Sequence, residues 1–316
     1  MTSNARTPTL AHPPPAAAAA VVQPLTPDFP RLGMTVRRLL RVIDSRSGGR
    51  RALNGLTTEE VKDVVFAPLT AATQLSLCEQ LQAEGDVGVN VAAWFVSHAW
   101  MSEFVELLEA LEHFFADTPQ GLDTCIWLDL VSTSQHGVFN RPPQWWAATF
   151  QTAIQSMGNM VMVISPWDKP VTLTRAWCIL ELYACCCNSA CRFEVALSNN
   201  QRQLLEVQCL DSADSFNSFL ANVNTESSQC SRESDRQSIF SAVRASVGFA
   251  ALDTIIRRTL SAWMLRMLHE RGVECDIENL PINSAMWLKA LGTQHLNLGM
   301  NEDSVRVLEE AVGLLK

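Results

Sequence analysis

A single glutamate stands in an apolar, helix-forming stretch in the second half of the chain. The segment from Ala176 to Cys191 reads AWCILELYACCCNSAC, and Glu181 is its only charged residue. Burial disfavours the ionised form of a carboxyl group, so such a residue is costly unless it is paired or used in chemistry. It follows a short apolar run, Met160 to Ile164, and a loop over residues 165–170. Strand, loop and helix in this order are how α/β proteins build sites at the carboxyl ends of strands.

Other side chains that could bind a nucleotide follow the predicted strands or begin the helix of Glu181. They are Ser97, His98, Trp100, Asp129, Trp167, Arg175 and Trp177. His98 could contact a phosphate or a ribose, and Arg175 could bind a phosphate through two hydrogen bonds. Each also has a structural interpretation: His98 as a hydrogen-bond partner, Asp129 as a cap of a helix or turn, and Arg175 as the partner of a nearby carboxylate.

The cysteines around this helix admit other chemistry. Cys178 could be a nucleophile working with His98, or a small buried hydrophobic residue. Cys185, Cys186, Cys187 and Cys191 form a cluster, but adjacent cysteines on one helix point in different directions. They cannot converge on one ion as Cys-x-x-Cys loops do, so we expect no metal site.

The elements that must position these residues alternate between strand and helix. Apolar runs at 91–96, 125–130, 160–164 and 193–197 predict strands, and residues 104–115, 145–157 and 176–187 have helical spacing. Strands of about five residues alternating with helices of about twelve are typical of a parallel sheet with helices on both faces. We therefore predict an α/β domain over residues 91–198.

The rest of the chain lacks this alternation. Residues 1–30 are rich in Pro and Ala and are expected to be disordered, and residues 31–90 read as a helical N-terminal segment. Residues 199–283 predict a helical extension, and residues 284–316 a hairpin of two helices. That hairpin has about the length of one tetratricopeptide repeat, and it either caps the preceding helices or begins a longer array.

Composition narrows the classes of partner and compartment. The formal net charge is −9, and the sequence has no basic footprint for nucleic acid or an anionic membrane. No apolar run reaches the roughly 20 residues that a membrane span needs. Ten cysteines without regular spacing indicate reduced thiols and a cytoplasmic protein. A transit peptide in the tail is the alternative, since the first 27 residues contain no acid, although Arg6 is their only basic residue.

The alternating region resembles Toll/interleukin-1 receptor (TIR) domains. Residues 94–100, WFVSHAW, look like the opening strand of that family, and residues 127–129, WLD, match the acid that ends its second strand. Residues 174–182, TRAWCILEL, are similar to the Trp-Cys-x-x-Glu-Leu helix of plant-type TIR domains. The resemblance implies a flavodoxin-like parallel sheet. In enzymatic members the matching glutamate, here Glu181, is the catalytic residue that cleaves NAD.

Residues 60–316 as a whole resemble TIR-like proteins that carry C-terminal tetratricopeptide repeats, a group often labelled kinesin-light-chain-like. The shared blocks are FVSHAW, SPW, LTRAWC and ELY. Two features depart from the enzymatic plant pattern. Arg175 stands where that pattern has a small hydroxyl residue, and the loop from Val131 to Gln144 does not match the usual loop chemistry.

Three functions follow as expectations. The first is a signalling NAD glycohydrolase in which Glu181 acts and NAD is substrate rather than cofactor. The second is a scaffold that self-associates or binds proteins through its helical repeats. The third is a nucleotide sensor without turnover.

Overall fold

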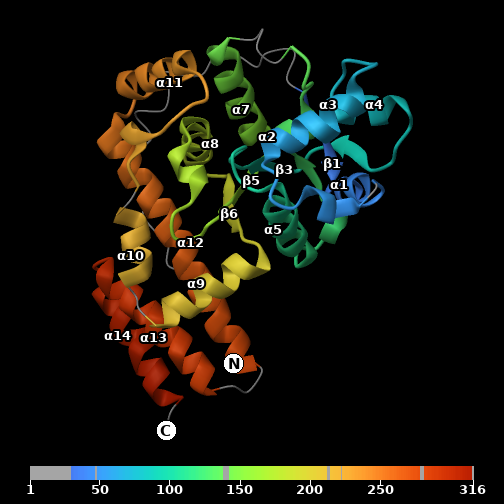
Figure 1. Cartoon of the computed structure of the whole chain (residues 1–316). Helices are drawn as coiled ribbons and strands as arrows, with labels where there is room; N and C mark the ends of the chain where they lie inside the picture. The colour runs from blue at the N-terminus through green and yellow to red at the C-terminus, as the bar shows by residue number, and fades with distance from the viewer. Residues whose placement is uncertain are drawn as a thin grey trace.

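A six-stranded sheet organises the first two thirds of the chain (Figure 1). The computed structural model describes residues 30–314 except 47, 138–141, 212–213, 222 and 278–280, so the predicted tail lies outside the described residues apart from residue 30. The strands are β1 (Leu32–Thr35), β2 (Val89–Val91), β3 (Trp94–Ser97), β4 (Cys125–Trp127), β5 (Asn159–Val163) and β6 (Arg192–Ala196). Their order across the sheet is β2-β1-β4-β3-β5-β6.

The sheet is mostly parallel, as the alternating pattern predicts. The strand β3 pairs in parallel with β4 on one side and β5 on the other, and β5 pairs in parallel with β6. Chain order therefore reverses between β3 and β5, since β4 lies on one side of β3 and the later strands lie on the other. In open α/β sheets, ligands bind at such a reversal, outside the carboxyl ends of the strands.

Helices cover both faces of the sheet. The helices α7 (Pro143–Met157) and α8 (Ala176–Cys186) pack together on one face, and α5 (Phe104–Ala116) packs on the other beside α1 (Val36–Asp44). Along β3 the side chains alternate, because Phe95 belongs to the core under α7 and α8, whereas Trp94 and Val96 belong to the core under α1 and α5. The strand β3 is thus buried on both faces, which is why it reads as part of a continuous apolar run.

The N-terminal segment corrects the prediction that residues 31–90 are helical throughout. It contains α1, α2 (Thr58–Val61), α3 (Ala67–Thr70) and α4 (Leu77–Ala83), but also β1 and β2. The strand β1 runs antiparallel to both β2 and β4 and so extends the sheet beyond the predicted 91–198 unit. The helix α2 is capped by Thr57, because Thr57 and Glu60 form a reciprocal capping box.

The chain after β6 is helical, as predicted. Its helices are α9 (Asn199–Asp211), α10 (Asp214–Ala221), α11 (Glu233–Ala245), α12 (Phe249–Ile277), α13 (Pro281–Asn297) and α14 (Asn301–Gly313). Figure 1 shows the long α12 passing the sheet on its way to the lower pair, α13 and α14. Because α13 packs against both α12 and α14, the predicted hairpin buries its apolar side on the preceding helix.

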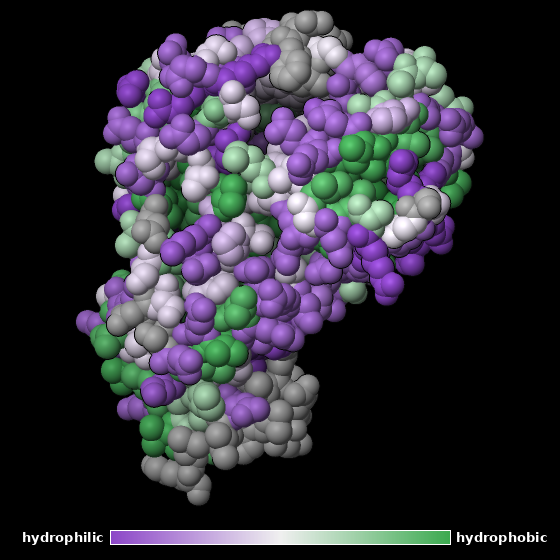
Figure 2. Space-filling model, in the orientation of Figure 1, coloured by the Kyte–Doolittle hydropathy of each residue, from purple (hydrophilic) through white to green (hydrophobic). Residues whose placement is uncertain are grey.

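The exposed surface is mixed in character. In the view of Figure 2, hydrophobic residues lie in separate patches among hydrophilic ones. Within the described ranges, no helix alone has the length and apolar content of a membrane span, although the bent pair Glu233–Ala245 and Phe249–Gly272 reaches those values when taken together.

Candidate functional site

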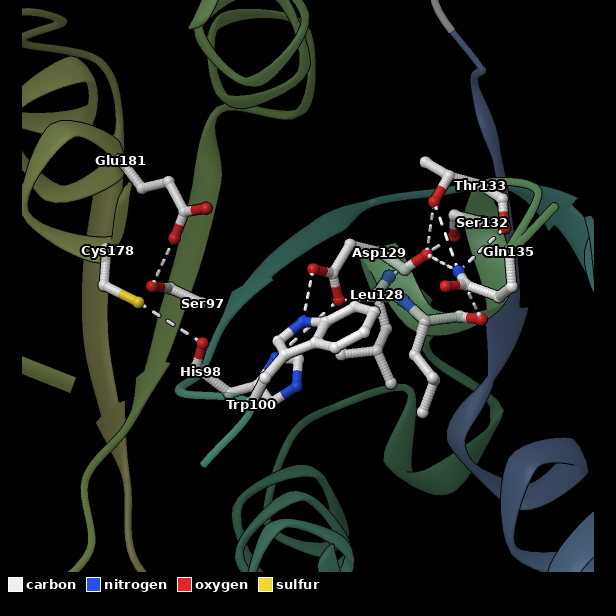
Figure 3. Close-up of polar contacts among 11 residues, drawn as sticks. Ser97, His98, Trp100, Leu128, Asp129, Ser132, Thr133, Gln135, Cys178 and Glu181 are labelled. Atoms are coloured by element: carbon white, nitrogen blue, oxygen red, sulfur yellow. Dashed lines mark hydrogen bonds and ion pairs between the residues drawn. The ribbon is translucent and has the colours of Figure 1, made fainter. Parts of the chain in front are cut away.

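Glu181 and Ser97 meet at the carboxyl end of β3. Ser97 is the last residue of that strand, and Glu181 reaches it from the middle of α8. The Ser97 hydroxyl donates a hydrogen bond of 2.6 Å to Oε2 of Glu181. Figure 3 shows Glu181 and Cys178 both extending from α8 toward the end of this strand. The helix thus places the only acid of its apolar stretch where the strand order reverses.

The side chain of Glu181 is buried. The residue is only 7% exposed. Within the described part of the chain, no Arg, Lys or His forms an ion pair with the Glu181 carboxyl group. Burial raises the pKa of Glu181 well above its usual range; the Ser97 hydrogen bond opposes that rise and the negative charge of Asp129 adds to it. The site therefore favours the protonated form of Glu181, and a positively charged group bound beside it would favour the ionised form.

His98, Trp100 and Asp129 form a second group beside it. The Trp100 indole donates a hydrogen bond of 2.7 Å to Oδ2 of Asp129, whose other oxygen accepts one from the Leu130 backbone at the start of the short helix α6 (Asp129–Ser132). Nδ1 of His98 lies 3.9 Å from Oδ1 of Asp129. Burial lowers the pKa of His98, while Asp129 opposes that change, so the ring is neutral near pH 7. Asp129 thus fixes the position of the Trp100 indole.

Both groups line one cavity of about 210 Å³. Its walls include Glu181, His98, Trp100, Asp129 and Trp177. The volume lies below the roughly 300–1,000 Å³ of typical ligand sites, so it could enclose one end of a dinucleotide with the remainder at its mouth. The structure thus brings these five predicted residues together around one space, with Ser97 directly behind Glu181.

Arg175 joins the cavity to the helical extension. Its guanidinium donates a hydrogen bond of 2.9 Å to the Ser231 hydroxyl and contacts Met101, and it forms no ion pair with a carboxylate of the described residues. The backbone of Arg175 pairs with that of Gln229. The Gln229 carbonyl accepts a hydrogen bond from the Ala176 amide, and the Gln229 amide donates one to the Thr174 carbonyl. Arg175 is therefore a rim residue whose backbone ties the start of α8 to the segment before α11.

Trp167 and Cys178 depart from their predicted functional roles. Trp167 is 4% exposed, packs near the Phe219 ring and is not among the residues that line the cavity, so we remove it from the site. The Cys178 thiol donates to the backbone carbonyl of His98 rather than to its imidazole. Burial raises the pKa of Cys178 well above that of a free thiol, which favours the core interpretation over the nucleophile.

Sequence reasoning missed part of the wall. Trp146 and Phe150 of α7 line the cavity, as do Glu59 of α2 and three residues before or within α11: Ser231, Arg232 and Asp235. A tryptophan pair at a helix start after two prolines was the available signal for α7. No local sequence pattern indicated that the residues near 231 lie beside the sheet. Among the described residues, the wall contains four carboxyl groups, Glu181 included, and two arginines.

Adjacent cysteines of the cluster point in different directions, as expected for neighbours on one helix. Cys185 contacts Cys191, whereas Cys186 contacts the hydroxyl of Thr259 on α12. Among the residues that the structure describes, no group of three or more His, Cys, Asp or Glu side chains could hold a metal ion.

Comparison of this chain with protein-family models, curated proteins and solved structures finds no match in any of the three.

Proposed function

We propose that this chain is a TIR-like NAD glycohydrolase that cleaves the bond between nicotinamide and ribose. The observation that carries the proposal is the buried Glu181 carboxyl, bonded to Ser97 and facing a cavity without a cationic partner in the described chain. A salt bridge filling that space would have argued for a structural acid. A buried acid beside a cavity is instead typical of a site whose ligand supplies the missing charge.

The strand order supports the flavodoxin-like part of the proposal. Taken alone, the parallel strands β4-β3-β5-β6 have the order second, first, third, fourth along the chain. This is the order of flavodoxin-like sheets up to their fourth strand, and such folds bind their ligand between the first and third strands. Ser97 ends the first of these strands, so the candidate acid lies at the corresponding place.

The chemistry requires stabilisation of positive charge. As the bond from ribose C1′ to nicotinamide breaks, its electron pair moves to the ring nitrogen and the sugar becomes oxocarbenium-like. Water then bonds to C1′ and loses a proton, which leaves neutral nicotinamide and ADP-ribose. An ionised Glu181 at about 4 Å from that charge would contribute about 4 kcal/mol at an effective dielectric of about 20. That corresponds to roughly a thousandfold in rate.

The direct test is release of nicotinamide by the purified chain. We expect the wild type to release it from NAD, and Glu181→Gln to reduce the rate by about a hundred- to a thousandfold, because the amide keeps the shape but not the charge. Glu309→Gln, an exposed acid on α14, is the matched control and should leave the rate unchanged. Intact NAD after incubation with concentrated wild-type protein would contradict the proposal.

A protein-interaction scaffold is the second candidate. Its specific support is the exposed apolar side chains on the last two helices: Met286, Leu296, Val305 and Val312 are 45–56% exposed. Thermal stability with and without NAD separates the candidates, because a ligand that binds only the folded chain raises its stability. A nucleotide sensor would show that shift without nicotinamide release, and a scaffold would show neither.

A further inference from the structure

Two cysteine thiols lie in contact at the end of α8. Cys185 is in the last turn of that helix, and Cys191 immediately precedes β6. The Sγ atom of Cys185 donates a hydrogen bond to Sγ of Cys191 across 2.9 Å. A disulfide has an S–S length of about 2.05 Å, so the two sulfurs are within about 1 Å of bonding distance.

A tight turn holds the two residues in this position. The Asn188 amide donates 3.0 Å to the Cys185 carbonyl, and the Cys191 amide donates 2.8 Å to the Asn188 carbonyl. The Asn188 side chain also accepts a bond of 3.1 Å from the Ala190 amide. Because the turn is closed by its own hydrogen bonds, the contact between the thiols does not depend on the cavity or on a ligand.

The two thiols differ in exposure and acidity. Cys185 is 2% exposed, whereas Cys191 is partly accessible. The hydrogen bond from Cys185 lowers the pKa of Cys191 below that of a free thiol, and the same bond together with burial raises the pKa of Cys185. The thiolate is the reactive form of cysteine, so the accessible partner is also the more nucleophilic one.

We propose that Cys185 and Cys191 form a reversible disulfide when the protein meets a peroxide. The Cys191 thiolate attacks one peroxide oxygen, the O–O bond breaks, and the departing oxygen takes up a proton and leaves as water. Cys191 is then a sulfenic acid, and the Cys185 sulfur attacks it. The S–S bond forms as the S–O bond breaks, and hydroxide leaves with the Cys185 proton as a second water. Two thiols lose two electrons and one hydrogen peroxide becomes two waters.

The bond would join the last turn of α8 to the residue that immediately precedes β6. Cys185 lies one helical turn after Glu181, at i and i+4 on the same helix face. Since the sulfurs already touch, oxidation would require little backbone movement. The disulfide would therefore fix this end of α8 in its present position rather than rearrange it, whether or not Glu181 acts on NAD.

The test is peroxide treatment of the fully reduced protein, alkylation of the remaining thiols, and mass spectrometry. Both cysteines fall on the single tryptic peptide between Arg175 and Arg192. We expect this peptide to lose two hydrogens and two alkylation sites, to show fragment ions that place the bond between Cys185 and Cys191, and to revert with a thiol reductant. Fragment ions that place the bond elsewhere, or no bond at all, would overturn the assignment without any variant.

Three serine variants test the order of the steps. Cys185→Ser should lose the disulfide and accumulate a sulfenic acid at Cys191, because no resolving thiol remains. Cys191→Ser should leave Cys185 unoxidised, since that thiol is buried. Cys187→Ser, which removes the neighbouring exposed thiol, is the control and should keep the disulfide. A disulfide that persists in either of the first two variants would contradict the proposed pair.

Discussion

Burial of the Glu181 carboxyl group costs stability in the folded chain. Glu181 is 7% exposed, and its only hydrogen bond that the structure records comes from the Ser97 hydroxyl. One neutral donor cannot replace the hydration of a charged carboxylate, so the folded state favours the protonated form. A structure that keeps such a residue gives up stability at neutral pH, where the unfolded chain would ionise the same group.

This cost has a predictable dependence on pH. Because the pKa of Glu181 is raised on folding, the folded state holds the proton over a range in which the unfolded state has released it. The protonated Glu181 therefore contributes fully to folding stability below the pKa of glutamate in the unfolded chain, near 4.3. That contribution is lost as the pH rises toward the pKa of Glu181 in the folded chain. The free energy of unfolding should fall there by up to about 1.4 kcal/mol per pH unit from this group alone.

Glu181→Gln isolates the effect, since the amide does not titrate. We expect the variant and the wild type to have closer stabilities near pH 4 and the variant to become progressively more stable relative to the wild type as pH rises. Urea unfolding at a series of pH values measures this difference. A difference that is constant with pH would show that Glu181 is ionised in the folded chain.

At this scale the sequence predicted which residue types matter better than what they contact. Glu181, His98, Trp100, Asp129 and Trp177 were each predicted for the site, because strand ends and a lone acid are local signals. The Ser97 contact and the absence of a cationic partner in the described chain depend on packing between segments 84 residues apart. No local pattern carries that information.

At the scale of the elements, β1 shows why a short strand that contains a glycine is difficult to predict from sequence. Its four residues include Gly33 and run directly into the cap of α1 at Thr35. Glycine weakens a strand pattern, so this segment reads as part of a helical region. The structure gives the reason for the glycine: a Cβ at position 33 would overlap the Ile126 carbonyl of β4 and approach the Ala92 side chain. The close approach of the β1 and β4 backbones thus requires a glycine, and a glycine adds nothing to the apolar pattern by which a strand is predicted.

Gly33→Ala should therefore weaken the pairing of β1 with β4. We expect a loss of about 1–3 kcal/mol, as for other insertions of a methyl group into filled space. Chemical denaturation measures it, with Gly313→Ala as the control. A Cβ at Gly313 meets no atom within 4 Å, and the residue is helical, so its replacement should be neutral or slightly stabilising. Equal effects of the two substitutions would contradict the close-approach argument.

At the scale of the whole molecule, one apolar core runs from the sheet into the last helices. It includes Phe95 of β3, Ile179 of α8, Leu260 of α12 and Leu291 of α13. The predicted units at 199–283 and 284–316 are distinct in sequence but share this core with the α/β part. Helix positions in this region were predictable from apolar spacing, whereas the return of the chain near residue 231 to the cavity was not.

The shared core predicts that the last hairpin contributes to global stability. Leu291→Ala, at a position 2% exposed on α13, should cost about 2–5 kcal/mol in a single unfolding transition. Leu296→Ala, 55% exposed on the same helix, should change stability by less than about 0.5 kcal/mol. Calorimetry with circular dichroism provides the measurement. Two separate transitions, of which only one responds to Leu291→Ala, would show that the hairpin unfolds independently.

The backbone pairing between Arg175 and Gln229 bears on how this protein is divided for experiments. A fragment ending with the last strand would keep Glu181 and Ser97 but would lack Ser231, Arg232 and Asp235, and its pocket would stand open on that side. Inactivity of such a fragment would therefore not count against the role proposed for Glu181.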